Sequence, residues 1–215
     1  KLIGQGVKYM SELLGEESKE YAIHTKGLEY PMHDPRAYTG MALSYATANR
    51  GACHLESLSY MVESGLPMKE LGYDEKNKID PHTSTQKAEL VVKLQNFMNV
   101  FNALGLCKFL LAGRVGPETV ADWVNMVTGW NLSKEELLKI GERLHNLKRM
   151  YNIKLGISRK DDTIPPRLLE LARNDGLAAG VLPDLDHMLT EYYQIRQWDQ
   201  QGIPTKDKLL ELKLE

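Results

Sequence analysis

The chain has 215 residues, of which 42% are hydrophobic and 26% charged, and its formal net charge is −2. This length suits one large domain, or one domain and part of a second. The charge balance excludes the strongly basic surface that nucleic-acid binding requires. No apolar run approaches the roughly 20 residues of a membrane span, and no leader of the charged-then-apolar kind opens the chain. The sequence therefore predicts a soluble, cytoplasmic protein without a nucleic-acid or membrane partner.

The first residues already follow a helical pattern. Apolar side chains recur at steps of three and four from Ile3 to Leu14, and Gly15 provides the left-handed residue that commonly ends a helix. A second short helix is expected over residues 18–23, with Ser18 as its N-cap. Helices seldom begin without a cap or lead-in, and none precedes Ile3. We therefore expect the chain to be a piece of a longer polypeptide.

Residues 33–55 form the most unusual stretch of the sequence. A turn signal at Asp34 and Pro35 leads into an expected helix from Thr39 to Ala48. Its small residues are Gly40, Ala42, Ser44, Ala46 and Ala48. Side chains of this size project little volume, so another backbone or a bulky ligand can come close. We interpret the stretch as poorly suited to core filling and expect a partner to lie against it.

The remaining elements all read as helices or loops. Residues 26–31 are expected to be extended, and residues 63–83 to form a polar surface loop. Helices are predicted from about Ser84, with an apolar face from Leu90 to Phe101; over 117–129; from the capping box of Ser133 and Glu136; near Pro166 and Pro183; and after Thr205. No alternating run of β-branched residues is present. We predict an all-α, irregular multi-helix fold, divided into residues 1–83 and 84–215 and packed as one compact unit.

His54 is the candidate for proton transfer. It follows the run Arg50-Gly51-Ala52-Cys53, so a group that titrates near neutral pH stands beside a cation and an open backbone. A hydrogen-bonded core histidine is the alternative. The other five histidines are scattered, and we assign them surface or turn positions: His24, His33, His82, His145 and His187.

A second candidate segment runs from Asn102 to Lys108. Its amide, its glycine backbone at Gly105 and its cation suit a polar heterocycle or a phosphate, although a helix-ending glycine with incidental neighbours explains them nearly as well. Cys107 beside Lys108 favours a thiolate, the form that binds metal. One thiolate cannot hold an iron–sulfur cluster, so Cys107 is either a small buried hydrophobe or a ligand whose partners lie outside the chain. Cys53 and Cys107 read as two reduced thiols, with one disulfide as the alternative.

These segments together resemble the C-terminal region of aldehyde ferredoxin oxidoreductases. The resemblance covers nearly the whole chain in order, and it rests on Lys26-Gly27-Leu28-Glu29, Asp34-Pro35-Arg36, Gly40-Met41, Tyr45-Ala46-Thr47, residues 50–54, Ser158 to Thr163, Pro166-Arg167, Glu191-Tyr192-Tyr193, Arg196, Trp198-Asp199, Gly202 to Thr205 and Lys208-Leu209. That family implies a helical C-terminal region, oxidation of aldehydes to carboxylic acids at a tungsten or molybdenum bis-pterin centre, and electron transfer through a [4Fe-4S] cluster to ferredoxin.

The resemblance also implies roles for individual residues. The family's pterin motif, Asp-x-x-Gly-Leu-Cys-x, matches at Gly105, Leu106 and Cys107, continues to Lys108, and departs at its first position, which is Asn102. By this match Cys107 is the fourth cluster ligand and the surrounding backbone holds a pterin. His54 resembles the histidine near the metal, and Arg50 is a candidate for an anionic part of the pterin or substrate, with a structural ion pair as the alternative.

Several parts of the complete enzyme are missing from the sequence. The chain has no Cys-x-x-Cys-x-x-x-Cys run for three further cluster ligands, and it lacks the family's β-rich N-terminal domain. We therefore expect it to bind neither cofactor alone and to be inactive without an N-terminal domain or a partner subunit, in an enzyme that can form a homodimer. The alternatives are a catalytically inactive structural module, or a relative that acts on acyl thioesters.

Overall fold

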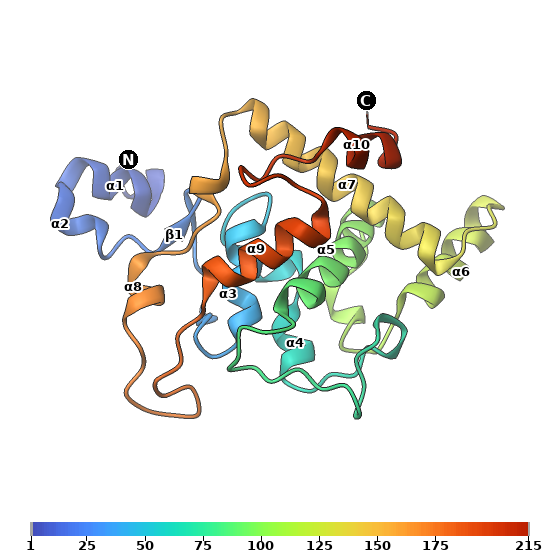
Figure 1. Cartoon of the computed structure of the whole chain (residues 1–215), viewed down its shortest axis with the longest axis horizontal. Coiled ribbons are helices and arrows are strands. Elements are labelled where there is room, and N and C mark those ends of the chain that lie inside the picture. The colour runs from blue at the N-terminus through green and yellow to red at the C-terminus, as the bar shows by residue number, and fades with distance from the viewer. Residues whose placement is uncertain (1, 215) are drawn as a thin grey trace.

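The computed structural model describes residues 2–214, which form ten α-helices and one small antiparallel hairpin (Figure 1). The predicted all-α fold is confirmed. The helices are α1 (Gly6–Leu14), α2 (Glu16–Lys19), α3 (Thr39–Thr47), α4 (Ser59–Glu63), α5 (Lys87–Leu104), α6 (Pro117–Thr128), α7 (Lys134–Lys154), α8 (Pro166–Glu170), α9 (Leu185–Arg196) and α10 (Lys206–Leu212). Single 3-10 turns are η1 (Ile3–Gln5), η2 (His54–Glu56), η3 (Lys69–Leu71), η4 (Lys108–Leu110) and η5 (Arg159–Asp161).

Helix α5 lies at the centre of the molecule. It packs against α7, α9 and α3 and also contacts η2 (Figure 1). Gly141 permits the close approach of α7, because a Cβ at this position would collide with the backbone carbonyl of Asn96 on α5. The apolar stripe of α5 predicted from the sequence, which includes Leu90, Leu94 and Phe97, is completely buried.

Helix α3 corrects our interpretation of the small-residue stretch. Every residue from Thr39 to Thr47 is buried, and Met41, Leu43 and Tyr45 belong to a hydrophobic core cluster. The prediction that this stretch is unsuited to core filling was therefore wrong. Small residues between the larger ones let α4, α5 and α9 pack around one helix. The partner that lies against the stretch consists of the protein's own helices.

Two hydrophobic clusters divide the interior. One joins α3, α9 and Trp198, and the other joins α5, α6 and the segment from Leu58 to Ile79. Within the predicted surface loop at residues 63–83, Met68, Leu71 and Tyr73 are buried in the second cluster. That loop is therefore a surface loop only in its polar part, because its apolar side chains pack with α5 in the second cluster.

The N-terminal region departs from two predictions. Residues His24–Thr25 (β1) pair with Leu28–Glu29 (β2) as an antiparallel hairpin, although no strand was predicted. Helix α2 has Gly15 rather than Ser18 at its N-cap. Ser18 lies inside this helix, where its hydroxyl donates to the Gly15 carbonyl oxygen at 2.7 Å.

A buried ion cluster fixes this hairpin to the rest of the molecule. The carboxylate of Asp162 accepts two hydrogen bonds from Arg149 of α7, at 2.9 and 2.7 Å, and one from the Tyr193 hydroxyl of α9 at 2.5 Å. The ammonium of Lys26, in the hairpin turn, lies 3.0 Å from the same carboxylate. Arg149 and Lys26 hold the pKa of Asp162 below its ordinary value against the opposing effect of burial. The cluster therefore joins the hairpin to α7 and α9 through Asp162.

Most later elements follow the sequence predictions. Helix α6 begins at Pro117 and ends before Gly129, and the capping box of Ser133 and Glu136 is present at the start of α7. Helix α9 begins at Leu185 with Asp184 as its N-cap. Along residues 2–214, no helix combines the length and the apolar character needed to cross a bilayer.

Candidate functional site

The loop after α3 and the C-terminal end of α5 meet at an open cleft of about 650 Å³. The loop contributes Asn49, Arg50 and Glu56, and the end of α5 contributes Asn102. Helix α7 supplies the opposite side with Leu147, Lys148, Tyr151 and Asn152. The structure thus brings together Arg50 and Asn102, two residues that the sequence singled out separately.

The cleft contains an unusual carboxylate. Glu56 is buried, and its Oε1 atom lies 3.6 Å from Nε of the exposed Arg50. Its Oε2 atom and the Oδ1 atom of Asn49 are both buried without a hydrogen-bond partner. Arg50 Nη2 also donates to the sulfur of Cys53 at 2.6 Å. Two unsatisfied acceptors beside a cation are expensive to keep in a folded protein, and this arrangement favours a ligand that donates hydrogen bonds.

Lys108 lies close to the same group of charges. Its ammonium donates to the Met98 carbonyl oxygen at 2.8 Å, at the end of α5. Burial lowers the pKa of Lys108 to about 8; the positive charges of Lys148 and Arg50 add to this effect, whereas Glu56 opposes it. In the described part of the chain Lys108 makes no hydrogen bond to Cys107. Its contacts run to the helix end instead of supporting a thiolate.

The turn that follows α5 is open to the outside. Gly105 has a φ of +67° and donates its N–H to the Phe101 carbonyl, which ends the helix. A Cβ at Gly105 would meet nothing within 4 Å, so another molecule can approach this backbone. Cys107 is exposed, which rules out the reading of a small buried hydrophobe, while Cys53 is buried and both thiols are free.

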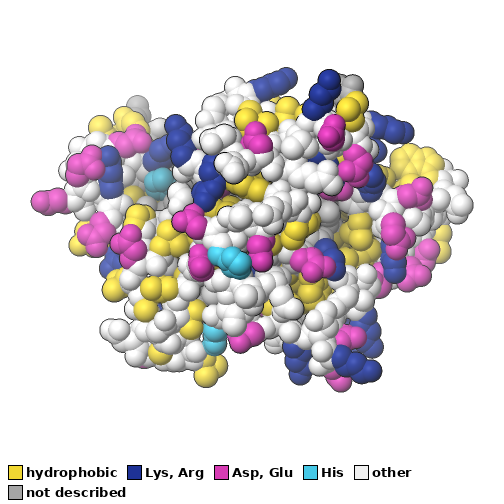
Figure 2. Space-filling model, viewed as in Figure 1, with side chains coloured by type: hydrophobic (Ala, Val, Ile, Leu, Met, Phe, Trp, Pro, Cys, Tyr) yellow, Lys and Arg dark blue, Asp and Glu magenta, His cyan; other side chains and the backbone are white. Residues whose placement is uncertain are grey.

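An apolar surface adjoins the turn. Leu104 and Leu106 line a groove of about 290 Å³ together with Trp123, Val127 and Trp130 of the α6 region. Apolar side chains are visible at the α6 end of the molecule in Figure 2. Leu106 therefore faces this groove, next to the cleft that holds Arg50 and Asn102.

His54 lies in η2, at the start of the turn that carries Glu56. Its imidazole ring is half-buried and rests against the ring of His33, with centroids 4.4 Å apart. Burial lowers the pKa of His54, and His33 and Arg50 lower it further. No hydrogen bond to the imidazole of His54 occurs within residues 2–214, so the reading of a hydrogen-bonded core histidine does not apply. His54 is not among the residues that line the cleft of Arg50, Glu56 and Asn102.

His145 was wrongly assigned to a surface or turn position. It is completely buried in α7, where its Nε2 atom lies 3.0 Å from the Tyr192 hydroxyl and its ring stacks on Trp198. Asn49 and Asn99 approach its Nδ1 atom at 3.2 and 3.3 Å. His145 therefore supports the loop that carries the cleft residues. Its isolated position in the sequence concealed this role.

Sequence reasoning also missed several residues of the cleft. Glu56, Asn49, Lys148 and Asn152 were not predicted, although Asn152 donates to the Asn49 carbonyl at 2.6 Å. The i, i+4 spacing of Lys148 and Asn152 indicates a shared helix face. Nothing in that spacing relates the face to a loop about 100 residues earlier.

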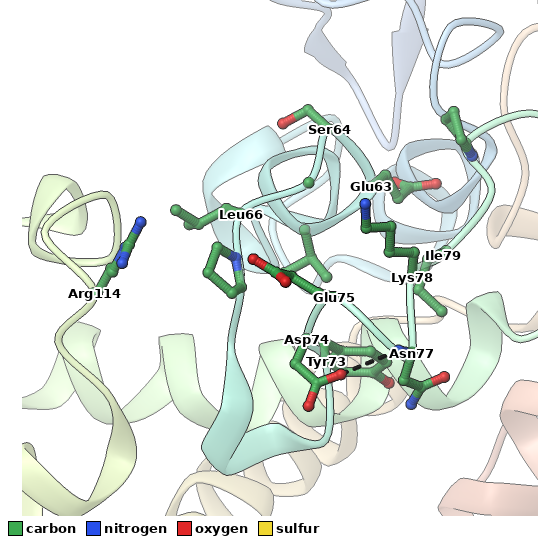
Figure 3. A pocket seen from close by; sticks show the side chains of 14 residues that line it. Glu63, Ser64, Leu66, Tyr73, Asp74, Glu75, Asn77, Lys78, Ile79 and Arg114 are labelled. Carbon is green, nitrogen blue, oxygen red and sulfur yellow. Dashed lines mark hydrogen bonds between the residues drawn. The ribbon is translucent and has the colours of Figure 1, made fainter.

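A separate cleft of about 520 Å³ lies between the segment from Val62 to Pro81 and Arg114 (Figure 3). Glu75 and Lys78 reach into it, and the N–H of Asn77 donates to the Asp74 carboxylate at 3.1 Å in its floor. None of the predicted site residues lines this cleft. We therefore place the candidate site at the cleft of Arg50, Glu56 and Asn102.

The residues at that cleft fit a pterin better than they fit a metal. Across residues 2–214, no group of three or more histidine, cysteine, aspartate or glutamate side chains is arranged to hold a metal ion. The unsatisfied acceptors of Glu56 and Asn49 match the N–H donors of a pterin ring, and the cations Arg50 and Lys148 match an anionic substituent. Cys107 is an exposed, free thiol at the turn after α5.

Comparison with known proteins identifies the family. Residues 1–214 match the family model described as "Aldehyde ferredoxin oxidoreductase, domains 2 & 3". The tungsten-containing aldehyde ferredoxin oxidoreductase of Pyrococcus abyssi is 40% identical over 198 residues, which cover 91% of this chain and 31% of that protein. The corresponding protein of Thermococcus kodakarensis is 36% identical over 212 residues, which cover 98% and 33%.

More distant relatives show the breadth of the group. An aliphatic sulfonate oxidoreductase, WOR-like subunit, from Pyrococcus furiosus is 28% identical over 94% of this chain. The active site complex BamBC of benzoyl coenzyme A reductase shares the fold, with a TM-score of 0.66 and 20% identity over 97% of this chain and 35% of that one. The chain spans about a third of the length of the curated relatives it matches. It belongs to the aldehyde ferredoxin oxidoreductase family and corresponds to domains 2 and 3 of that family.

Proposed function

We propose that this chain forms one wall of a tungsten or molybdenum bis-pterin site in an enzyme that oxidises aldehydes to carboxylic acids. The observation that carries the proposal is the unsatisfied carboxylate oxygen of Glu56 in a cleft shared with Arg50 and Asn102. Family membership supports it, because the relatives are tungsten-containing oxidoreductases. When bound, the pterin-held metal supplies the two-electron oxidation, and a [4Fe-4S] cluster carries single electrons to ferredoxin.

Each polar residue of the cleft has a distinct part in holding the pterin. Glu56 Oε2 and Asn49 Oδ1 accept hydrogen bonds from ring N–H groups, and Arg50 and Lys148 attract an anionic substituent. Asn102 both donates and accepts, although it lacks the negative charge found at this motif position in the family. The open backbone at Gly105 and Leu106 provides the contact surface next to Asn102.

His54 and Cys107 have the roles closest to the reaction. A half-buried imidazole with a lowered pKa is neutral at pH 7, so one ring nitrogen of His54 can accept a proton from substrate or water. Cys107 is an exposed, free thiol on the turn after α5 and can provide one cluster ligand. The three remaining ligands come from outside this chain.

The complete enzyme requires more than this chain. Because the chain spans about a third of its curated relatives, an N-terminal domain or a partner subunit supplies the opposite wall of the site and the other cluster ligands. Ferredoxin is the electron acceptor in this proposal, the cytoplasm is the compartment, and the complete enzyme can assemble as a homodimer.

Metal analysis of the complete gene product tests the proposal. After anaerobic purification, we expect tungsten or molybdenum together with iron, and aldehyde-dependent reduction of a viologen dye or ferredoxin. His54→Asn should lower turnover and leave the metal content intact, whereas the matched change His187→Asn on the exposed face of α9 should alter neither. A product that contains neither tungsten nor molybdenum would falsify the proposal.

Asn102 favours a second candidate, a structural module that keeps the fold without the chemistry. The amide removes a charge at the motif position that contacts the pterin in the family. Asn102→Asp tests this alternative by metal analysis. Gain of metal in the variant from a metal-free parent would support the structural module, and metal in both proteins would exclude it.

A further inference from the structure

We propose that His33 is a positioning residue for His54: its ring, 4.4 Å from that of His54, fixes the imidazole in place and disfavours a proton on it. This inference rests on the proposed catalytic role of His54. The effect of His33 on the protonation of His54 can be measured with or without the bound cofactors.

The rings of Tyr60, His33 and His54 form one aromatic cluster. Tyr60 of α4 stacks on His33 with centroids 5.2 Å apart and an interplanar angle of 27°, and His33 lies against His54 at 4.4 Å and 36°. Tyr60 and His54 are themselves 6.3 Å apart, so the three rings form a triangle in which His33 is the nearer neighbour of His54. Removing the His33 ring would leave His54 with the more distant Tyr60 on that side.

The backbone of His33 is held on both sides. Its N–H donates to the Pro31 carbonyl at 2.7 Å, and its carbonyl accepts a hydrogen bond from the Tyr45 hydroxyl of α3 at 3.1 Å. Because α3 is buried throughout, this contact ties His33 to the core. His33 is therefore a fixed support for the His54 ring and not a mobile surface group.

The carboxylates next to the pair along the chain each have a cationic partner. Asp34, next to His33, is paired with Arg36 at 2.7 Å and approached by Arg173 at 3.8 Å. Glu56, two residues after His54, faces Arg50 at 3.6 Å.

The other titratable groups around the pair do not help either. Burial raises the pKa of Tyr60, which is therefore neutral at pH 7, and Arg50 adds positive charge. Lys108, in the turn after α5, adds a further positive charge near Glu56 and Cys53. A proton on His54 is thus opposed by burial and by Coulomb repulsion from His33 and Arg50.

Titration of the histidine Cε1–H NMR signals in the purified protein tests the coupling. In the wild type, the His54 signal should titrate below the usual pH of a histidine, because burial and His33 lower its pKa. His33→Phe and His33→Gln remove that neighbour, so the His54 midpoint should move to a higher pH.

The matched control is His187→Phe, since His187 lies on α9 outside this aromatic cluster. It should leave the His54 midpoint unchanged. An unchanged His54 midpoint in both His33 variants, with wild-type circular dichroism, would overturn the proposal. Should the phenylalanine variant misfold, His33→Gln still decides it.

A second measurement uses the loaded enzyme. The acid limb of the pH–rate profile should move to higher pH in His33→Gln with the metal content unchanged, whereas a merely structural role would lower the rate equally at all pH values. If the proposed function is wrong, the His33 variants will still shift the His54 midpoint, but His54→Asn will not change turnover. If the present inference is wrong, the His33 variants will leave the His54 midpoint unchanged, while His54 is still required for turnover.

Discussion

The ion pair of Arg50 and Glu56 uses one of the two carboxylate oxygens. Nε of Arg50 lies 3.6 Å from one carboxylate oxygen of Glu56, while the other oxygen is buried without a partner. A buried acceptor without a hydrogen bond costs about 1–3 kcal/mol. Glu63, the partner of Lys87, also has one unsatisfied oxygen, but Glu56 differs from it in lining the cleft that Asn102 and α7 complete.

Glu56→Gln should weaken retention of the pterin and its metal in the complete enzyme. The change keeps the shape of the side chain and removes the charge that accepts donor groups of the ligand. It should also move the pKa of Lys108 below about 8, because Glu56 opposes the downward shift of that group. Metal analysis measures the first effect, and the pH dependence of lysine acylation followed by mass spectrometry measures the second. Glu135→Gln, at an exposed position of α7, is the control and should change neither.

Lys108 should make stability depend on pH above neutrality. Its folded pKa of about 8 lies below the unfolded value of about 10.4, so the unfolded chain binds more protons between these two values. The free energy of unfolding should therefore gain a contribution as pH rises through this window. Lys108→Met should remove that rise, and Lys154→Met, an exposed change at the end of α7, should retain it. Urea unfolding at pH 7.5 and pH 10 compares the variants; equal pH dependence in both would contradict the assignment.

Arg149→Met should be among the most destabilising single changes. It leaves the buried carboxylate of Asp162 with Lys26 as its remaining cation, and loss of one partner of a buried pair costs about 3–5 kcal/mol. Arg159→Met removes a more exposed pair with Asp186 and should cost less than about 1 kcal/mol. Chemical denaturation at pH 7 gives both values, and similar losses in the two variants would show that burial does not govern them.

His145 should destabilise the fold in acid. Burial, followed by the charges of Arg196, Lys148 and Arg149, places its pKa well below the ordinary value. Below about pH 6.5 the unfolded chain therefore protonates this histidine and the folded chain does not. The contribution of His145 to the free energy of unfolding is complete above about pH 6.5 and decreases as pH falls below it. His145→Gln should lower the melting temperature at pH 7 but flatten its dependence between pH 7 and pH 5. The exposed change His187→Gln should preserve the wild-type slope.

The sequence determined the helices to a large extent. The apolar stripe from Leu90 to Phe101, the proline at the start of α6 and the capping box of Ser133 and Glu136 are local signals, and each one produced the expected element. The hairpin at residues 24–29 escaped prediction because two-residue strands carry no usable alternation. Its position depends on Lys26 reaching Asp162, a contact between distant parts of the chain.

The site was determined less completely. The motifs around Arg50, His54 and Cys107 could be recognised from neighbouring residues along the chain, and they were sufficient to indicate the family. Burial of α3 and the free oxygen of Glu56 could not be anticipated in this way. Both depend on which helices pack together, since Gly141 lets α7 approach α5 and thereby brings Lys148 and Asn152 to the loop of Asn49. The sequence alone therefore determined the local elements and the family, whereas tertiary packing decided which charges and acceptors share one cleft.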